Sequence, residues 1–168
     1  MSATFQWVQD NGVASAKVTT VLGISGNLFN YKKKDDAVAA NYGSYPITAS
    51  QRSYEVYLRG KFTGAFNRVD NIQFWRSTDF SPNTGLSIKW APSTPSAYAT
   101  PVSGTSRCVS AIPTSDPGTA NVRCRGGLAS GLVASGYTDH IITQLATTSA
   151  ALPGDTSLAI FTLNYDES

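Results

Sequence analysis

The amino-acid sequence predicts an all-β protein: an antiparallel β-sandwich of the jelly-roll type, with long Ser/Thr/Pro-rich loops and at most one short helix. Helical periodicity is nearly absent, because apolar residues do not recur at helical spacing over any window of about 11 residues. Short segments of alternating apolar and polar residues are frequent instead. Clusters of Pro, Gly, Asn, Asp and Ser separate these segments, as is typical of a sandwich or barrel.

The predicted elements follow from this alternation and punctuation. One or two helical turns are expected at 35–43, where aspartates could cap the first turn and Gly43 could end the last. The strands are predicted at 4–9, 16–24, 54–63, 72–77, 85–91, 139–148 and 157–167, with shorter ones at 106–112 and 121–126 inside the long loop that follows residue 91.

Length and composition indicate one domain. The 168 residues suit a single β-sandwich over residues 1–168, in which residues 1–50 form either an N-terminal arm or outer strands. Charged residues make up 14% of the chain, against about 25% in typical soluble domains. A net charge of +2, from 13 basic and 11 acidic residues, does not favour a nucleic-acid partner. The mixed run YKKKDD at 31–36 is expected to be a solvated loop.

The passage SYEVYLRGKFTGAFNRVDNIQFWRS at 53–77 is the most regular in the chain. Its period of two predicts a core face, with Gly60 where another group packs closely or the strand bends. The opposite face, which carries Tyr57 and Arg59, is expected to be wet. Trp75 lies opposite Phe74, so it packs either under a second core layer or against a neighbouring subunit. Because Tyr, Trp and Arg are enriched at interfaces, Tyr57, Arg59 and Trp75 are the candidate interface residues.

The final predicted strand, 157–167, carries apolar residues on both faces. Ala159, Phe161, Leu163 and Tyr165 share one face, and Leu158 and Ile160 lie on the other. This pattern predicts either a central strand covered on both sides or a strand that a subunit partner covers.

Groups able to carry out catalysis are few, and the sequence predicts no enzyme, no metal site and no cofactor. The single histidine, His140, follows Asp139 in a predicted strand, so these two side chains point to opposite faces and cannot form a dyad there. His140 is therefore expected to be a satisfied or surface histidine. No HExxH, GxSxG or GxxxxGK[ST] motif occurs. One histidine and two cysteines also supply too few ligands for a transition metal.

Two cysteines, Cys108 and Cys124, lie in short β-like segments joined by a Pro- and Gly-rich turn. A hairpin could bring them close enough for a disulfide. Synthesis in the cytosol favours free thiols, whereas life in a released particle would permit oxidation. Both states stay open at this point.

The sequence begins without a basic region followed by an apolar stretch, and no apolar run reaches about 20 residues. We therefore expect neither a signal peptide nor a membrane partner. The protein would stay in the cytoplasm or leave by another route, such as a particle released by lysis.

The pattern YEVYLRGKFTGAFNRVDNIQFWRS resembles a recurrent signature of small all-β virion structural proteins of tailed bacteriophages. The segments TGLSIKWA, YATPVS, IPTSDPGTANV, SGYTDHIITQLATT and FTLNYDE follow in the same order as in that family. The resemblance covers residue 53 to the end, about two thirds of the chain. It carries over no catalytic residue and says nothing of a disulfide.

The resemblance implies a non-enzymatic virion component, assembled in the host cytoplasm. A capsid decoration or auxiliary protein that binds the major capsid protein is the leading expectation, as a homo-oligomer with a trimer as the first hypothesis. A collar, neck or tail protein is the alternative within the virion. A carbohydrate-binding adhesin is the alternative outside this class, with Tyr54 or Tyr57, Trp75 and Trp90 as sugar platforms. A hydrolase is disfavoured because the catalytic groups are missing.

Overall fold

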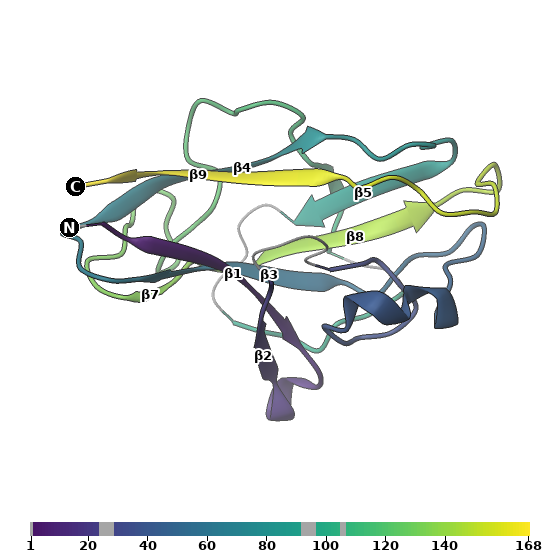
Figure 1. Cartoon of the computed structure of the whole chain (residues 1–168), viewed down its shortest axis with the longest axis horizontal. Helices are drawn as coiled ribbons and strands as arrows, with labels where there is room; N and C mark the ends of the chain where they lie inside the picture. The colour runs from purple at the N-terminus through teal and green to yellow at the C-terminus, as the bar shows by residue number, and fades with distance from the viewer. Residues whose placement is uncertain (1, 24–28, 92–96, 105–106) are drawn as a thin grey trace.

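The computed structural model describes residues 2–23, 29–91, 97–104 and 107–168. Figure 1 shows extended strands running along the long axis, with both chain termini at the same end. Two short 3₁₀ helices occur, η1 (Ala14–Ala16) and η2 (Ala39–Ser44). The strands are β1 (Thr4–Asn11), β2 (Val18–Val21), β3 (Val56–Thr63), β4 (Val69–Thr78), β5 (Leu86–Ala91), β6 (Ser110–Ala111), β7 (Gly136–Tyr137), β8 (Ile141–Thr147) and β9 (Ile160–Glu167).

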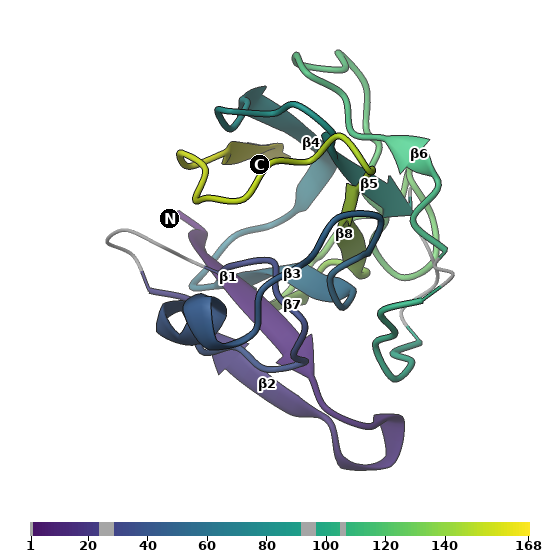
Figure 2. The same cartoon turned by 90° about the vertical axis from the view of Figure 1, so that its right-hand side faces the viewer.

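All strand pairs are antiparallel, and within the described ranges they form two sheets. The larger sheet has seven strands, in the order β2-β1-β3-β8-β5-β6 with β7 beside β3, and the smaller sheet pairs β4 with β9. Figure 2 shows β4 and β9 as a separate layer above β1 and β3. The all-β sandwich is confirmed, whereas the jelly-roll connectivity stays a prediction.

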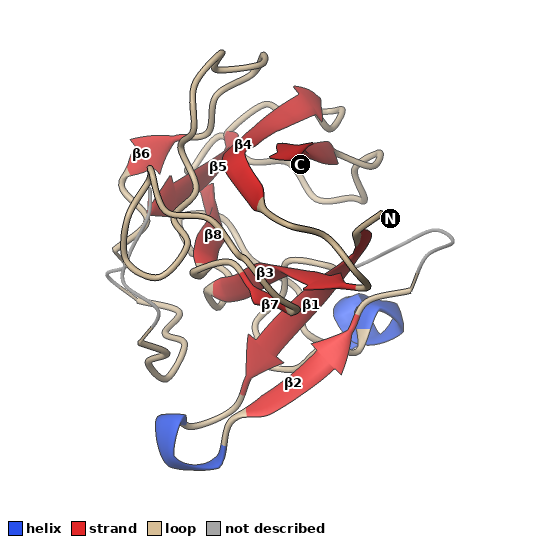
Figure 3. Ribbon diagram, turned by 90° about the vertical axis from the view of Figure 1, so that its left-hand side faces the viewer, coloured by secondary structure: helices blue, strands red, loops and turns tan. Residues whose placement is uncertain are grey.

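The first fifty residues contribute directly to the larger sheet. β1 lies between β2 and β3, and β2 is at the margin, as Figure 3 shows from the side of the chain termini. β1 pairs with β3 over seven positions, from Thr4↔Thr63 to Asp10↔Tyr57. The predicted strand at 16–24 is confirmed over 18–21, and its last residue lies outside the described part of the chain.

The main core lies between the two sheets. From β3 it contains Val56, Leu58 and Phe62, all buried, as the alternation predicts. Gly60 on the same strand is needed because a Cβ there would come within 3.0 Å of the Phe5 ring. The expected close approach at Gly60 is therefore confirmed. Aromatic rings from both sheets fill the centre: Trp90 is 5.6 Å from Phe74, and Phe74 is 5.7 Å from Phe161 between ring centroids.

The opposite face of β3 is not wet, and this prediction is wrong. Tyr57 and Glu55 are 0% and 2% exposed. The described parts of the loop between β5 and β6 fold over this face, because Tyr98 packs on Tyr57 at 5.0 Å and the Val102 N–H donates to Glu55. A second buried apolar cluster forms there from Tyr57, Ala91, Cys108 and Ile142.

Two further segments differ from the sequence predictions. In the run YKKKDD, Lys32 is buried and its ammonium group contacts Asp36, the Val38 carbonyl and Asn41. The run is therefore an internally satisfied turn, since one lysine finds three oxygen acceptors within nine residues. The helical turn expected at 35–43 occurs slightly later, as η2.

The C-terminal strand is not a central strand. In the described structure β9 pairs with β4 alone. Ala159, Phe161, Leu163 and Tyr165 pack on the core as predicted, whereas Leu158 and Ile160 are 63% and 52% exposed. Of the two alternatives for the outer apolar face, the central strand is thus wrong, and cover by a partner remains a proposal.

Candidate functional site

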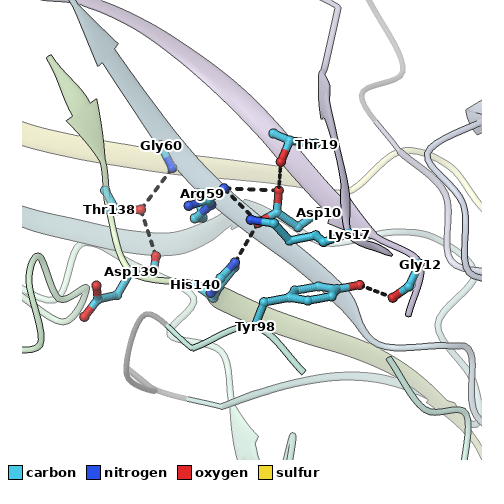
Figure 4. A network of polar contacts seen from close by, with 10 residues as sticks. All are labelled: Asp10, Gly12, Lys17, Thr19, Arg59, Gly60, Tyr98, Thr138, Asp139 and His140. Atoms are coloured by element: carbon cyan, nitrogen blue, oxygen red, sulfur yellow. Dashed lines mark hydrogen bonds and ion pairs between the residues drawn. The ribbon is translucent and has the colours of Figure 1, made fainter. Parts of the chain in front are cut away.

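A buried ionic network joins four strands on the outer face of the larger sheet. Asp10, at the end of β1, lies at its centre and is 1% exposed. Figure 4 shows Thr19 of β2, Arg59 of β3, Lys17 just before β2 and His140 just before β8 converging on this carboxylate. Its partners are Arg59 Nη2 at 2.8 Å, His140 Nε2 at 2.8 Å, Lys17 Nζ at 3.0 Å and Thr19 Oγ1 at 2.6 Å.

Strand pairing places these groups together. Asp10 lies opposite Thr19 on β2 and opposite Tyr57 on β3, and Arg59 is two positions from Tyr57, so Thr19 and Arg59 share the face of the sheet that carries Asp10. His140 immediately precedes β8, which pairs with β3. The contact between Arg59 and Asp10 therefore joins two neighbouring strands of the sheet.

The electrostatics of the network stabilise the ionised carboxylate. Burial by itself raises the pKa of Asp10, but hydrogen bonds from His140, Thr19 and Lys17 and the charge of Arg59 outweigh burial. The pKa of Asp10 therefore lies well below its usual range. The Asp10 carboxylate is therefore bound by protein groups instead of by water, and it holds those groups in place.

His140 is held on all sides by the protein. The rings of Tyr57 and Tyr98 lie 5.4 and 5.8 Å from the imidazole, and the side chain is 1% exposed. Its Nδ1 atom is buried and has no hydrogen-bond partner within the described structure. The surface alternative predicted for His140 is therefore wrong, and of its two ring nitrogens Nε2 is satisfied, by Asp10, whereas Nδ1 is not within the described structure. Asp139 points elsewhere and accepts from the Gly126 N–H, so the excluded dyad with Asp139 is absent from the described structure.

The three candidate interface residues have different surroundings. Tyr57 is fully buried and Arg59 is mostly buried against Asp10 and the Tyr137 ring. Tyr57 is therefore not available as an interface residue, which corrects the prediction for it. Trp75 on β4 is partly exposed and belongs to neither buried apolar cluster. Arg59, whose side chain is 14% exposed, and Trp75 stay predicted interface residues.

The cysteines are free thiols in the structure. Cys124 belongs to the main core and Cys108 to the second cluster, so the two lie in different apolar environments. Burial raises the pKa of the Cys124 thiol to about 12. The disulfide alternative is therefore not the state found here.

An apolar cavity of about 280 Å³ lies between the two sheets. It is lined by Trp7, Leu58, Ile88 and Leu145 of the larger sheet and by Phe161 of β9. None of the described residues that line it is charged. The remaining lining residues are Phe29, Asn30, Tyr31, Phe80 and 156–160.

No group of three or more His, Cys, Asp or Glu side chains among the described residues is arranged to hold a metal ion. No helix in that part of the chain is long and apolar enough to cross a membrane.

Sequence reasoning did not find Asp10. A single aspartate in QDNG after a strand has no neighbour in sequence that marks it, and its partners are up to 130 positions away. The apolar cavity also lacked a signal, because its lining residues are ordinary core residues of separate strands.

Comparison with known proteins gives no relative: no family model, no curated protein and no solved structure matches the chain.

Proposed function

We propose that the chain is a non-enzymatic structural component of a tailed phage virion that works by binding other protein chains. A capsid decoration or auxiliary protein bound to the major capsid protein is the specific form, and a neck, collar or tail protein is the alternative. The virion assignment is supported by the sequence resemblance over residues 53–168. The binding role is supported by the surface of the sandwich.

One observation carries the binding role. Leu158 and Ile160 line an uncharged cavity and are more than half exposed. Leu158 lies just before β9 and Ile160 begins it, and the outer edge of β9 has no partner strand in the described structure. Large apolar residues exposed around a concave site are typical of surfaces that another molecule covers. The low fraction of charged residues, 14%, also suits close packing against neighbours.

The network around Asp10 supports a structural role for the most polar part of the molecule. Its carboxylate is engaged by four donors, and each donor comes from a different position in the fold. Such an arrangement fixes strand register and orientation. It therefore favours a rigid building block that keeps its shape when it binds.

A carbohydrate-binding adhesin is less well supported. Tyr57 and Trp90 are 0% and 3% exposed, so neither ring can stack on a sugar. Tyr54 and Trp75, which are partly exposed, remain as platforms. Titration of the protein with a glycan panel, followed by tryptophan fluorescence, tests this alternative, and any saturable shift would favour it.

Quantitative mass spectrometry of purified virions tests the proposed function. A decoration protein should be present at a copy number comparable to that of the major capsid protein or a simple fraction of it. A copy number of about 6 or 12 would assign the chain to the neck or tail, whose assemblies are symmetric rings. Absence of the chain from purified virions would overturn the virion proposal.

The proposed homo-oligomer is tested separately, by measuring the molar mass of the protein in solution. Light scattering coupled to size exclusion should give three times the chain mass of 17.8 kDa if the trimer forms without the particle. A monomer at all concentrations would assign assembly to the particle surface instead and would remove the trimer proposal for the free protein.

A further inference from the structure

The cavity, the exposed residues at its mouth and the outer edge of β9 lie together. Ile160 and Phe161 both line the cavity, and they are the first two residues of β9. Figure 2 shows β9 at the margin of its layer, on the side of β4 away from β5 and β6. Three features that different parts of a ligand could use are therefore next to one another.

The backbone of β9 presents unpaired groups on this margin. Phe74 on β4 directs its N–H and carbonyl groups away from β9, toward the Asn121 side chain, at 2.7 and 2.8 Å. Gln73 and Trp75 therefore face Asn164 and Thr162 of β9, and the intervening Phe161 and Leu163 turn their backbone groups outward. Within the described residues, no hydrogen bond satisfies this outer edge.

The cavity selects by size and charge. Its volume of about 280 Å³ is nearly twice that of a cavity of about 150 Å³ that holds benzene, so it can take a side chain as large as Phe or Trp. The described lining carries no charge that could pair with an ion. Burial of an unpaired charge is strongly unfavourable, so the group that enters is neutral.

The exposed residues Leu158 and Ile160 favour a polypeptide over a small molecule as the ligand of this site. A small molecule inside the cavity would cover its walls but leave the outer parts of Leu158 and Ile160 in water. It would also leave the backbone groups of Phe161 and Leu163 unpaired. An extended polypeptide can satisfy all three features, since its backbone adds to a sheet edge while its side chains enter a neighbouring pocket.

A second copy of β9 does not fit this site as well. The inward side chains of β9, Phe161 and Leu163 among them, are already packed in their own core. The exposed apolar residue of β9, Ile160, lies on the opposite face of the strand from Phe161, so a copy of β9 paired to this edge would bring no free side chain to the inner face of the sheet. The occupant is a segment whose apolar side chains are not already buried.

We propose that this site anchors an extended segment of a partner polypeptide: a neutral Phe, Trp or Leu side chain of the partner fills the cavity, and its backbone runs along the outer edge of β9. The site rests on the proposed function as a binding protein, and it names the chemistry by which that binding occurs. Buried aromatic or aliphatic anchors in pockets of this kind commonly dominate interface affinity.

The site is tested by selecting peptides that bind the immobilised full chain from an unbiased display library of random seven-residue peptides. Enriched peptides should share one large apolar residue. Changing that residue to Ser should weaken binding about tenfold or more, and N-phenyl-1-naphthylamine, a neutral apolar dye, should compete with the peptides.

Two variants connect binding to the residues named. The substitution Ala159→Leu places extra methyl groups at the cavity, and the double substitution Leu158→Ser/Ile160→Ser removes the apolar mouth; each should lower peptide affinity about tenfold. Val109→Ser is the matched control, because Val109 is 74% exposed and lies just before β6 at the margin of the other sheet, and it should leave binding unchanged. Thermal unfolding of each variant confirms that it is folded.

Three results of the peptide selection and dye binding would overturn the proposal. Failure to enrich any peptide, or enrichment of peptides without an apolar anchor, overturns the proposal. Dye binding without peptide binding assigns the cavity to a small molecule and also overturns it. Dimers of the chain that exclude the peptides would assign the edge to a second copy, again against the proposal. None of these results depends on virions, so the site and the virion assignment can fail independently.

Discussion

Asp10 and His140 are 130 positions apart in the chain, and their side chains meet at 2.8 Å in the interior of the protein. Asp10 is the second-last residue of β1 and His140 precedes β8, and β3 lies between these two strands in the sheet. The contact therefore joins strands that do not pair with each other. Arg59 of β3 completes the connection, because it binds the same carboxylate.

Removal of the Asp10 charge should strongly destabilise the fold. In Asp10→Asn, the cationic groups of Lys17 and Arg59 lose a buried counter-charge, and such a loss costs about 3–5 kcal/mol when both partners are buried. Since Lys17 keeps partial contact with solvent, we expect about 3 kcal/mol in urea unfolding at pH 7. Asp166→Asn, at an exposed carboxylate, is the control and should cost less than about 0.5 kcal/mol. Equal effects of the two substitutions would contradict the role given to Asp10.

The same carboxylate should make stability depend on acid pH. The folded-state pKa of Asp10 lies below the ordinary value of 3.8, so its contribution is complete above that value and is lost as pH falls through the folded value. The gap in unfolding free energy between wild type and Asp10→Asn should therefore shrink as the pH falls from about 5 to about 2. A gap that stays constant over this range would show that the Asp10 charge is not stabilised by folding.

The thiols should be inert in the folded protein. Because burial raises the pKa of Cys124 to about 12, from an ordinary value of 9.0, its thiolate fraction falls roughly a thousandfold. Ellman's reagent at pH 8 should react slowly with native protein and quickly with two thiols per chain after denaturation. Rapid reaction of the native protein, or fewer than two thiols in denaturant under non-reducing conditions, would contradict two buried free cysteines.

Tyr57 and Trp75 should respond differently to truncation. Tyr57→Ala removes a fully buried ring, and such truncations cost about 3–5 kcal/mol. Trp75→Ala removes a partly exposed ring outside both buried clusters and should cost about 1 kcal/mol or less. Calorimetry of both variants measures the difference. A cost for Trp75→Ala as large as that for Tyr57→Ala would place Trp75 in a core layer and remove it as an interface residue.

The sequence predicted the elements whose information is local. Alternation identified β1, β3, β5, β8 and β9 and the core face of β3, because side chains that are two positions apart in a strand share a face. It could not state whether the other face is covered. The loop that buries Tyr57 and Glu55 is about fifty residues further along the chain, and its turn-rich composition does not indicate where it packs.

The ionic network around Asp10 and the apolar cavity could not be predicted from local sequence patterns, because both depend on which strands are neighbours in the fold. Asp10 receives its partners from strand order, and strand order is not encoded in the alternation of any single strand. The two-sided apolar pattern of 157–167 did contain part of the answer, since it allowed for a partner. In the described structure β9 pairs with β4 alone, which removes the central-strand alternative, and Leu158 and Ile160 stay exposed, as the proposed contact with a partner requires.

The most direct measurement of the central claim is the binding of purified chain to virion particles assembled without it. Particles from a phage deleted for this protein are mixed with wild-type chain or with Leu158→Ser/Ile160→Ser, and bound chain is quantified after sedimentation. The account predicts saturable binding of the wild type and much weaker binding of the folded variant. No binding of the wild type would contradict the virion role, and equal binding of both proteins would contradict the part assigned to β9.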